Sequence, residues 1–388
     1  MSLSRAAGLL LVIIYLGFVS LGLPDGTLGV AWPAVYPELR LPVGLAGVLM
    51  LVGTLLTATS GFSSGWVAAR FRTGPVVLVS CALTSGAMLL LSQAHSAAML
   101  FIAVIPLGLG AGAVDAGLNG YVARHYSGRH MNWLHACWGI GATAGPLVMG
   151  RALATAHGWR GGYLAIGSIQ LGLAALFLAT LRLWEKVPTH AAVATAAAAS
   201  ATPTRTAASF EGWLSAVIFA LYTGAELSIG LWAGTILVVD RGFAPERAAL
   251  WVAGYYGAIT AGRIGIGFVH GRWTNRAIVR AGTLLAGASA LGFAFGGSGL
   301  VAVVSLALIG LGFAPVYPGL MHEVPRRFAP EAVQTVIGRQ SGAGALGAAV
   351  FPALSGAIAQ EALSGVIVLA LALMLALAVA IGWLDRRT

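Results

Sequence analysis

The chain has 388 residues and a formal net charge of +10, and 58% of its residues are hydrophobic while only 9% are charged. Because about a quarter of the residues in a soluble domain are charged, most of this chain is expected to lie in lipid, which excludes a soluble enzyme. The two cysteines, Cys81 and Cys137, both lie in apolar segments, so we predict neither a disulfide framework nor a metal cluster.

Twelve apolar segments are long enough to cross a bilayer, which requires about 20 residues per helix. Short polar turns separate them, and 54 glycines are spread through the chain, as suits close helix packing. We therefore predict an all-α membrane protein with twelve transmembrane helices. In chain order the predicted helices are residues 6–31, 43–69, 75–92, 98–123, 131–156, 159–182, 211–239, 247–270, 276–296, 299–321, 336–360 and 363–384.

The basic residues follow the positive-inside rule. With the amino terminus in the cytoplasm, sixteen of the 22 Lys and Arg residues fall on the cytoplasmic side and five outside, while Arg263 lies within the eighth helix. This distribution predicts a multi-pass protein of a bacterial-type inner membrane with both termini in the cytoplasm, and it argues against a nucleic-acid partner. The first apolar stretch is too long for a removable signal peptide and is predicted to remain as a helix.

A segment at residues 185–209, rich in Ala and Thr, interrupts the pattern of apolar helices. We interpret it as a cytoplasmic linker between two six-helix bundles, at residues 1–184 and 210–388. An internal repeat supports two related halves. The run from Gly65 to Arg70 corresponds to the run from Gly267 to Arg272, and each run follows the second helix of its half.

Two six-helix halves with the substrate near the midplane between them are the architecture of major facilitator transporters. The run Gly65-Trp-Val-Ala-Ala-Arg70-Phe-Arg72-Thr-Gly74 resembles the signature of that superfamily between its second and third helices. The signature normally has Asp before its first Arg, where this chain has Ala69. The resemblance implies a major facilitator fold of two pseudo-symmetric bundles. The predicted gate or structural charges are Arg70, Arg72, Arg263 and Arg272.

Three acidic residues lie within predicted helices, where an ionisable group costs several kcal/mol unless it faces a cavity or a partner. Asp25 lies between Pro24 and Gly26, a combination that interrupts a helix where the backbone lines a cavity. Asp115 lies four residues before Asn119, so the two polar groups share one helix face. We predict proton coupling at Asp25, Asp115 and Glu226.

Each of these acids also has a structural interpretation. Asp25 could be solvated and inert at the outer end of its helix. Asp115 could be a packing residue paired with Arg263, and Glu226 could form a buried pair with the same arginine. These alternatives stay open at the level of the sequence.

The fifth predicted helix carries candidates for substrate binding. Asn132, His135 and Trp138 follow one another at a spacing of three and share one stripe of the helix. The alternative for His135 is a hydrogen-bonded residue of the bundle, and we predict no metal there. The complete predicted substrate-binding set is Asp115, Asn119, Asn132, His135, Trp138, Trp32, Tyr317 and Gln340.

Within the superfamily the chain resembles the fucose-galactose-glucose:proton symporter branch. The resemblance rests on the runs Gly22 to Pro33, Asp115 to Asn119, Asn132 to His135 and Gly312 to Pro318. In fucose permease-like proteins, acids on the first and fourth helices couple to protons, and polar residues of the fifth helix contact the sugar. The matching positions here are Asp25, Asp115, His135 and Trp138.

We predict a secondary active transporter that moves a small polar solute, a monosaccharide by the resemblance, together with a proton by alternating access. Two alternatives stay open: a proton-coupled antiporter that exports drugs or metabolites, and a transporter-fold sensor or lipid-moving protein. An enzyme is not predicted, since no nucleophile with an adjacent base and no phosphate-binding loop is found. The predicted partners are the solute and membrane lipids, with the proton as coupling ion, no other cofactor, and the monomer as the functional unit.

Overall fold

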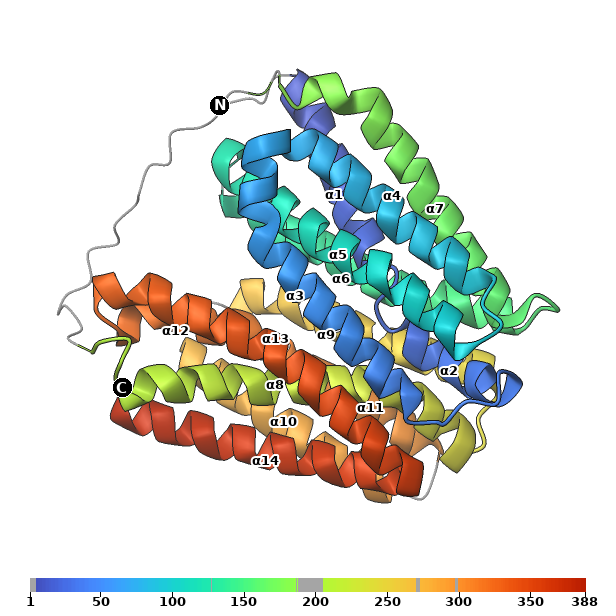
Figure 1. Cartoon of the computed structure of the whole chain (residues 1–388). Coiled ribbons are helices and arrows are strands. Elements are labelled where there is room, and N and C mark those ends of the chain that lie inside the picture. The colour runs from blue at the N-terminus through green and yellow to red at the C-terminus, as the bar shows by residue number, and fades with distance from the viewer. Residues whose placement is uncertain (1–4, 127, 186, 188–204, 270–272, 297–298) are drawn as a thin grey trace. The chain divides into compact units, whose positions relative to one another are not determined.

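The computed structural model describes residues 5–126, 128–185, 187, 205–269, 273–296 and 299–388, and these are almost entirely helical (Figure 1). Helices in the amino-terminal half are α1 (Arg5–Gly22), α2 (Thr27–Glu38), α3 (Leu45–Phe71), α4 (Thr73–Ser92), α5 (Ala97–His125), α6 (Gly128–Leu153) and α7 (Gly158–Thr180). Those in the carboxy-terminal half are α8 (Phe210–Thr235), α9 (Pro245–Val269), α10 (Asn275–Phe295), α11 (Gly299–Phe313), α12 (Val316–Arg327), α13 (Pro330–Glu361) and α14 (Leu363–Arg387).

The all-α prediction is confirmed, because every predicted membrane segment corresponds to one helix or to two consecutive helices. Among the described residues, ten helical spans are long and apolar enough to cross a membrane. The other two long helices, α6 and α9, carry more polar side chains, including Arg151 near the end of α6 and Glu246 in the first turn of α9. The central part of the predicted linker, residues 188–204, lies outside the described residues.

Two predicted helices are interrupted in the structure. The sequence predicts one helix over residues 6–31, whereas α1 ends at Gly22 and α2 begins at Thr27. Pro24 has no backbone N–H for a helix, and Gly26 has a φ of 73°, which strains a residue with a Cβ. The span predicted at residues 299–321 is likewise divided, into α11 and α12 before Val316, and it extends to Arg327. The first break places Asp25 at a bend of the chain.

The chain forms two compact units. In the first unit, α4 packs against α5 and α7, and α1 packs against α6. In the second, α8 packs against α13 and α14, and α10 packs against α11 and α14 (Figure 1). The units comprise Met1–Pro42, Val52–Ala194 and Phe243–Ala253, and Val43–Leu51, Thr195–Gly242 and Gly254–Thr388.

Glycines permit the closest helix contacts within each unit. A Cβ added at Gly141 of α6 would lie 1.9 Å from the backbone oxygen of Val19 in α1. In the second unit, a Cβ added at Gly347 of α13 would lie 2.1 Å from the backbone oxygen of Ala220 in α8. Because backbone cannot yield as a flexible side chain does, a larger residue at these positions would push the helices apart, and the helices pack backbone to backbone.

Candidate functional site

The bend between α1 and α2 brings Asp25 to the indole of Trp138 in α6. Trp138 Nε1 donates a hydrogen bond of 2.8 Å to Asp25 Oδ2. Just before the bend, α1 and α6 lie close together, because a Cβ added at Gly22 would lie 2.2 Å from the backbone oxygen of Trp138. Both side chains are half-buried. A residue predicted to couple protons and a residue predicted to bind substrate therefore touch each other directly.

Asp115 and Asn119 form a second polar pair, on α5. Asn119 Nδ2 donates to Asp115 Oδ1 at 2.9 Å and to the backbone oxygen of Asp115 at 3.0 Å. By accessible surface Asp115 is exposed and Asn119 is half-buried. The spacing of four residues is what places the amide beside the carboxylate.

The other candidates of the first unit differ in accessibility. His135 is exposed, and its ring meets the ring of Phe18 edge-on at 5.8 Å between centroids. Trp32 is fully buried and packs against Tyr36, so its ring contributes to the core of the first unit. The side chain of Asn132 lies outside the described part of the structure.

The second unit contains a buried acid opposite an arginine. Glu226 on α8 is 6% exposed and interacts electrostatically with Arg263 on α9, which is half-buried. Tyr222, one turn before Glu226, lies beside both charged groups and is 1% exposed. Tyr255 Oη donates to the backbone oxygen of Glu226 at 2.9 Å and so ties α9 to α8.

Tyr317 and Gln340 occupy different surroundings in this unit. Tyr317, in the first turn of α12, is 38% exposed, and its ring lies edge-on to Phe219 at 5.1 Å. Gln340 is 1% exposed, and its Nε2 donates to Ser215 Oγ, which joins α13 to α8. Tyr317 is therefore exposed, whereas Gln340 is buried and joins two helices.

Two of the predicted gate arginines, Arg70 and Arg72, are exposed. Arg72 has a φ of 65° and forms an ion pair with Glu185, and both side chains are exposed. Exposed ion pairs contribute about 0–1 kcal/mol, so this pair adds little to stability. Arg70 is exposed, and Arg272 lies outside the described residues.

The second unit also contains a buried charge network that the sequence did not predict. Asp385 of α14 accepts from Arg280 Nε at 2.7 Å and from Arg327 Nη2 at 2.5 Å. Glu323 of α12 accepts from Arg276 Nε at 3.1 Å and from Arg326 Nη1 at 3.0 Å. The side chains of both acids are at most 4% exposed, and together they hold α10, α12 and α14 at one end of the unit. The spacing of Arg276 and Arg280 on one helix face was the available signal.

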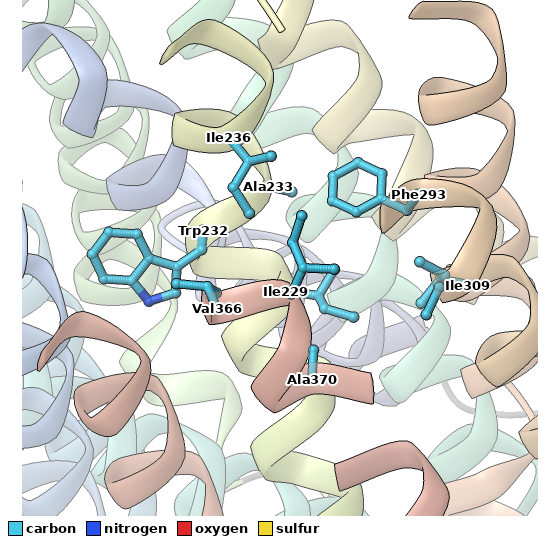
Figure 2. Close-up of a pocket in the computed structure, with 10 residues that line it drawn as sticks. Ile229, Trp232, Ala233, Ile236, Phe293, Ile309, Val366 and Ala370 are labelled. Atoms are coloured by element: carbon cyan, nitrogen blue, oxygen red, sulfur yellow. The ribbon is translucent and has the colours of Figure 1, made fainter. Parts of the chain in front are cut away.

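An apolar cavity of about 10 Å³ lies elsewhere in the second unit, among α8, α10, α11 and α14 (Figure 2). Its volume is that of roughly one water molecule, and its lining offers no polar side-chain partner. It therefore has room only for a small apolar group and offers no site for a polar solute. The lining residues are Ile229, Trp232, Ala233, Ile236, Ala290, Phe293, Ile309, Val366, Ile367 and Ala370. Among the described residues no group of His, Cys, Asp and Glu side chains could hold a metal ion.

The ten apolar helical spans of the described residues define a multi-pass membrane protein, and three of the spans carry the carboxyl groups of Asp25, Asp115 and Glu226. The chain belongs to the Major Facilitator Superfamily, whose family model matches residues 14–352. It is accordingly a secondary transporter and not an enzyme. No curated protein sequence matches the chain.

Solved transporter structures share the fold over almost the whole chain. A bacterial homologue of the human lysosomal transporter Spinster, in an inward-facing and occupied conformation, has a TM-score of 0.83 at 13% identity, covering 99% of this chain and 98% of its own. A variant of the nucleoside transporter NupG has a TM-score of 0.75 at 14% identity, with coverages of 96% and 98%. A variant of the peptide transporter POT in complex with alafosfalin has a TM-score of 0.75 at 16% identity, with coverages of 97% and 95%. Because these transporters carry different substrates, the shared fold does not identify the solute of this chain.

Proposed function

We propose that this protein is a proton-coupled symporter of a small polar solute, a monosaccharide in the manner of the fucose permease-like branch, working by alternating access. The observation that carries the proposal is the hydrogen bond of 2.8 Å between Trp138 Nε1 and Asp25 Oδ2. It joins a carboxyl that can change its protonation to an aromatic ring that can pack against a sugar. The halves that would rock are residues 1–184 and 210–388, in an inner membrane with both ends of the chain in the cytoplasm.

The contact supplies a physical means of coupling. The indole N–H donates to the ionised form of Asp25, so it favours the carboxylate while the bond is intact. A solute that packs against Trp138 and moves its ring would weaken this bond and favour proton uptake by Asp25. By thermodynamic linkage the proton would then tighten solute binding by the same factor.

Asp115, Asn119 and His135 supply further polar groups on the same unit. The Asp115 carboxylate and the Asn119 amide are 2.9 Å apart and together offer an acceptor and a donor to solute hydroxyls. His135 is exposed and adds a ring nitrogen that can donate or accept. These groups fit a hydroxylated solute better than an apolar drug, which would leave them without hydrogen bonds.

Recording pH in lightly buffered vesicles that contain the purified protein tests the proposal. Neutral hexoses, deoxyhexoses and unrelated metabolites are added in turn, and we expect the outside to become alkaline with one sugar. No change in external pH with any sugar, together with proton release on adding a cationic or lipophilic compound, would instead establish the antiporter.

Variants of the two contacting residues sharpen this test. Asp25→Asn removes the titrating group and is expected to abolish proton-coupled uptake, while Trp138→Phe keeps the ring but removes the hydrogen bond to Asp25. Trp133→Phe is the matched control, because Trp133 is an exposed tryptophan on the same helix. Normal proton-dependent uptake by both Asp25→Asn and Trp138→Phe would contradict the coupling role of this contact.

A further inference from the structure

Gln170 of α7 is a buried polar residue that has no task in the mechanism above. It is 1% exposed, and its Nε2 donates a hydrogen bond of 3.0 Å to the backbone oxygen of Ser20 in the last turn of α1. We propose that Gln170 is a positioning residue for proton coupling, because it holds the end of α1 so that Asp25 stays against Trp138. This inference rests on the proposed proton-coupled symport and concerns how its coupling contact is maintained.

The carbonyl group that Gln170 contacts is one that a proline leaves without its helical donor. In a continuous helix the oxygen of Ser20 would accept from the N–H four residues later, but that residue is Pro24, which has no N–H. The backbone N–H of Leu23 donates to this oxygen at 3.3 Å, at the long end of hydrogen-bond distances. Ser20 is 6% exposed, so bulk water has little access to it. The amide of Gln170 therefore supplies the donor that this buried carbonyl group requires.

Packing alone does not call for an amide at this position. Gln170 Oε1 is buried and has no hydrogen-bond partner among the described residues. A buried polar atom without a partner costs free energy, and a leucine of similar volume would fill the same space without that cost. The hydrogen bond to Ser20 is therefore what distinguishes Gln170 from an apolar residue.

Helix α7 also holds the other side of the bend that carries Asp25. Trp159, in the first turn of α7, donates from Nε1 to Glu38 Oε2 at 2.7 Å, and Glu38 is the last residue of α2. Both α1 and α2 pack against α7, whereas Asp25 itself accepts its hydrogen bond from Trp138 of α6. The segment is thus fixed to one helix on both sides of the bend and makes its coupling contact with another helix.

A loosened end of α1 would separate proton uptake from solute binding. With Gln170 in place the position of Asp25 is set, so its hydrogen bond to Trp138 breaks when a solute moves the indole. Without the bond to Ser20 the bend gains freedom, and Asp25 can leave the indole whether or not a solute is bound. Proton and solute then bind more independently of each other, so the coupling free energy between them falls. The expected defect is a smaller number of protons moved per solute molecule.

Vesicles containing the full-length protein test this inference when external pH and the uptake of labelled glucose, galactose and fucose are recorded in parallel. Gln170→Leu keeps the volume and removes the donor, and we expect the ratio of protons to sugar to fall by roughly two-fold or more. The ratio does not depend on how many molecules are folded, so a merely structural role would lower both rates and leave the ratio unchanged. Ser85→Ala is the matched control and is expected to keep the ratio, because Ser85 Oγ donates to the backbone oxygen of Gly167 at 2.9 Å and so joins α4 to the same helix.

Hydrogen exchange separates a failure of this inference from a failure of the proposed symport. Exchange of the amides at residues 19–30 is expected to become faster in Gln170→Leu and to stay unchanged in Ser85→Ala. Either an unchanged ratio or unchanged exchange in Gln170→Leu would overturn the positioning role while the proposed symport stands. If the unaltered protein takes up these sugars without protons, or takes up none of them, the proposed symport is overturned and the positioning role with it.

A second variant keeps the test valid if Gln170→Leu does not fold. Gln170→Met preserves the unbranched shape of the side chain without the N–H donor, and methionine adapts readily to buried sites. We expect the same fall in the ratio of protons to sugar. An unchanged ratio in Gln170→Met would contradict the assignment.

Discussion

Removing Arg327 is expected to lower the stability of the second unit substantially. Its guanidinium lies between two buried acids, with Nη2 at 2.5 Å from Asp385 Oδ1 and Nε at 3.8 Å from Glu323 Oε2. The side chain is only 4% exposed, so bulk water screens its ion pairs little. An Arg327→Ala variant leaves both carboxylates in place but removes the charge that they share.

The size of the effect follows from the partners that remain. Breaking a buried ion pair by removing one partner costs about 3–5 kcal/mol. Asp385 keeps Arg280 at 2.7 Å and Glu323 keeps Arg276 at 3.1 Å, which places the expected loss near the lower end, about 3 kcal/mol. For a folding unit of 150–250 residues this corresponds to a fall in Tm of roughly 6–12 °C.

Thermal unfolding in detergent, followed by tryptophan fluorescence, measures this fall. Arg326→Ala is the matched control, because Arg326 pairs with the same Glu323 at 3.0 Å but is 59% exposed, so its loss is expected to cost less than about 1 kcal/mol. Equal Tm values for the two variants, or an unchanged Tm for Arg327→Ala, would refute the reasoning that burial gives the network its strength.

Further predictions follow from packing and exposure. Gly141→Ala is expected to destabilise by about 1–3 kcal/mol, because its Cβ would lie 1.9 Å from a backbone oxygen of α1, while Gly172→Ala has nothing within 4 Å and is expected to be neutral. Equal unfolding temperatures for these two variants would contradict the tight crossing of α1 and α6. Ala370→Val adds two methyl groups beside an apolar cavity that has room for about one, so overpacking is expected to lower stability by about 1–3 kcal/mol, seen as a lower Tm; a higher Tm would mean that the cavity takes both groups. Glu185→Ala removes the exposed partner of Arg72 and is expected to change stability by less than about 0.5 kcal/mol, a value checked by the same unfolding assay.

Several features of this protein could be derived from the sequence because they depend on residues near one another in the chain. Hydropathy over about 20 residues identified the membrane helices, since the cost of placing a polar segment in lipid is local. The contact of Asn119 with Asp115 followed from a spacing of four residues on one helix. The residues that interrupt the first span, Pro24 and Gly26, were also recognisable, although the end of α1 at Gly22 and the extension of α2 to Glu38 were not.

Only the tertiary structure decided which residues meet across different helices. The partner of Asp25 is Trp138, 113 positions away, and the partners of Asp385 are Arg280 and Arg327 on two other helices. Trp32 and Gln340, both predicted to bind substrate, are buried, and Gln340 donates a hydrogen bond to Ser215 that links α13 to α8. Composition and spacing determined that this chain crosses a membrane as a helical bundle, because hydropathy and helix periodicity are properties of a single segment. The pairing and accessibility of its charges depend on which faces of the packed helices point toward one another, and that is a property of the fold.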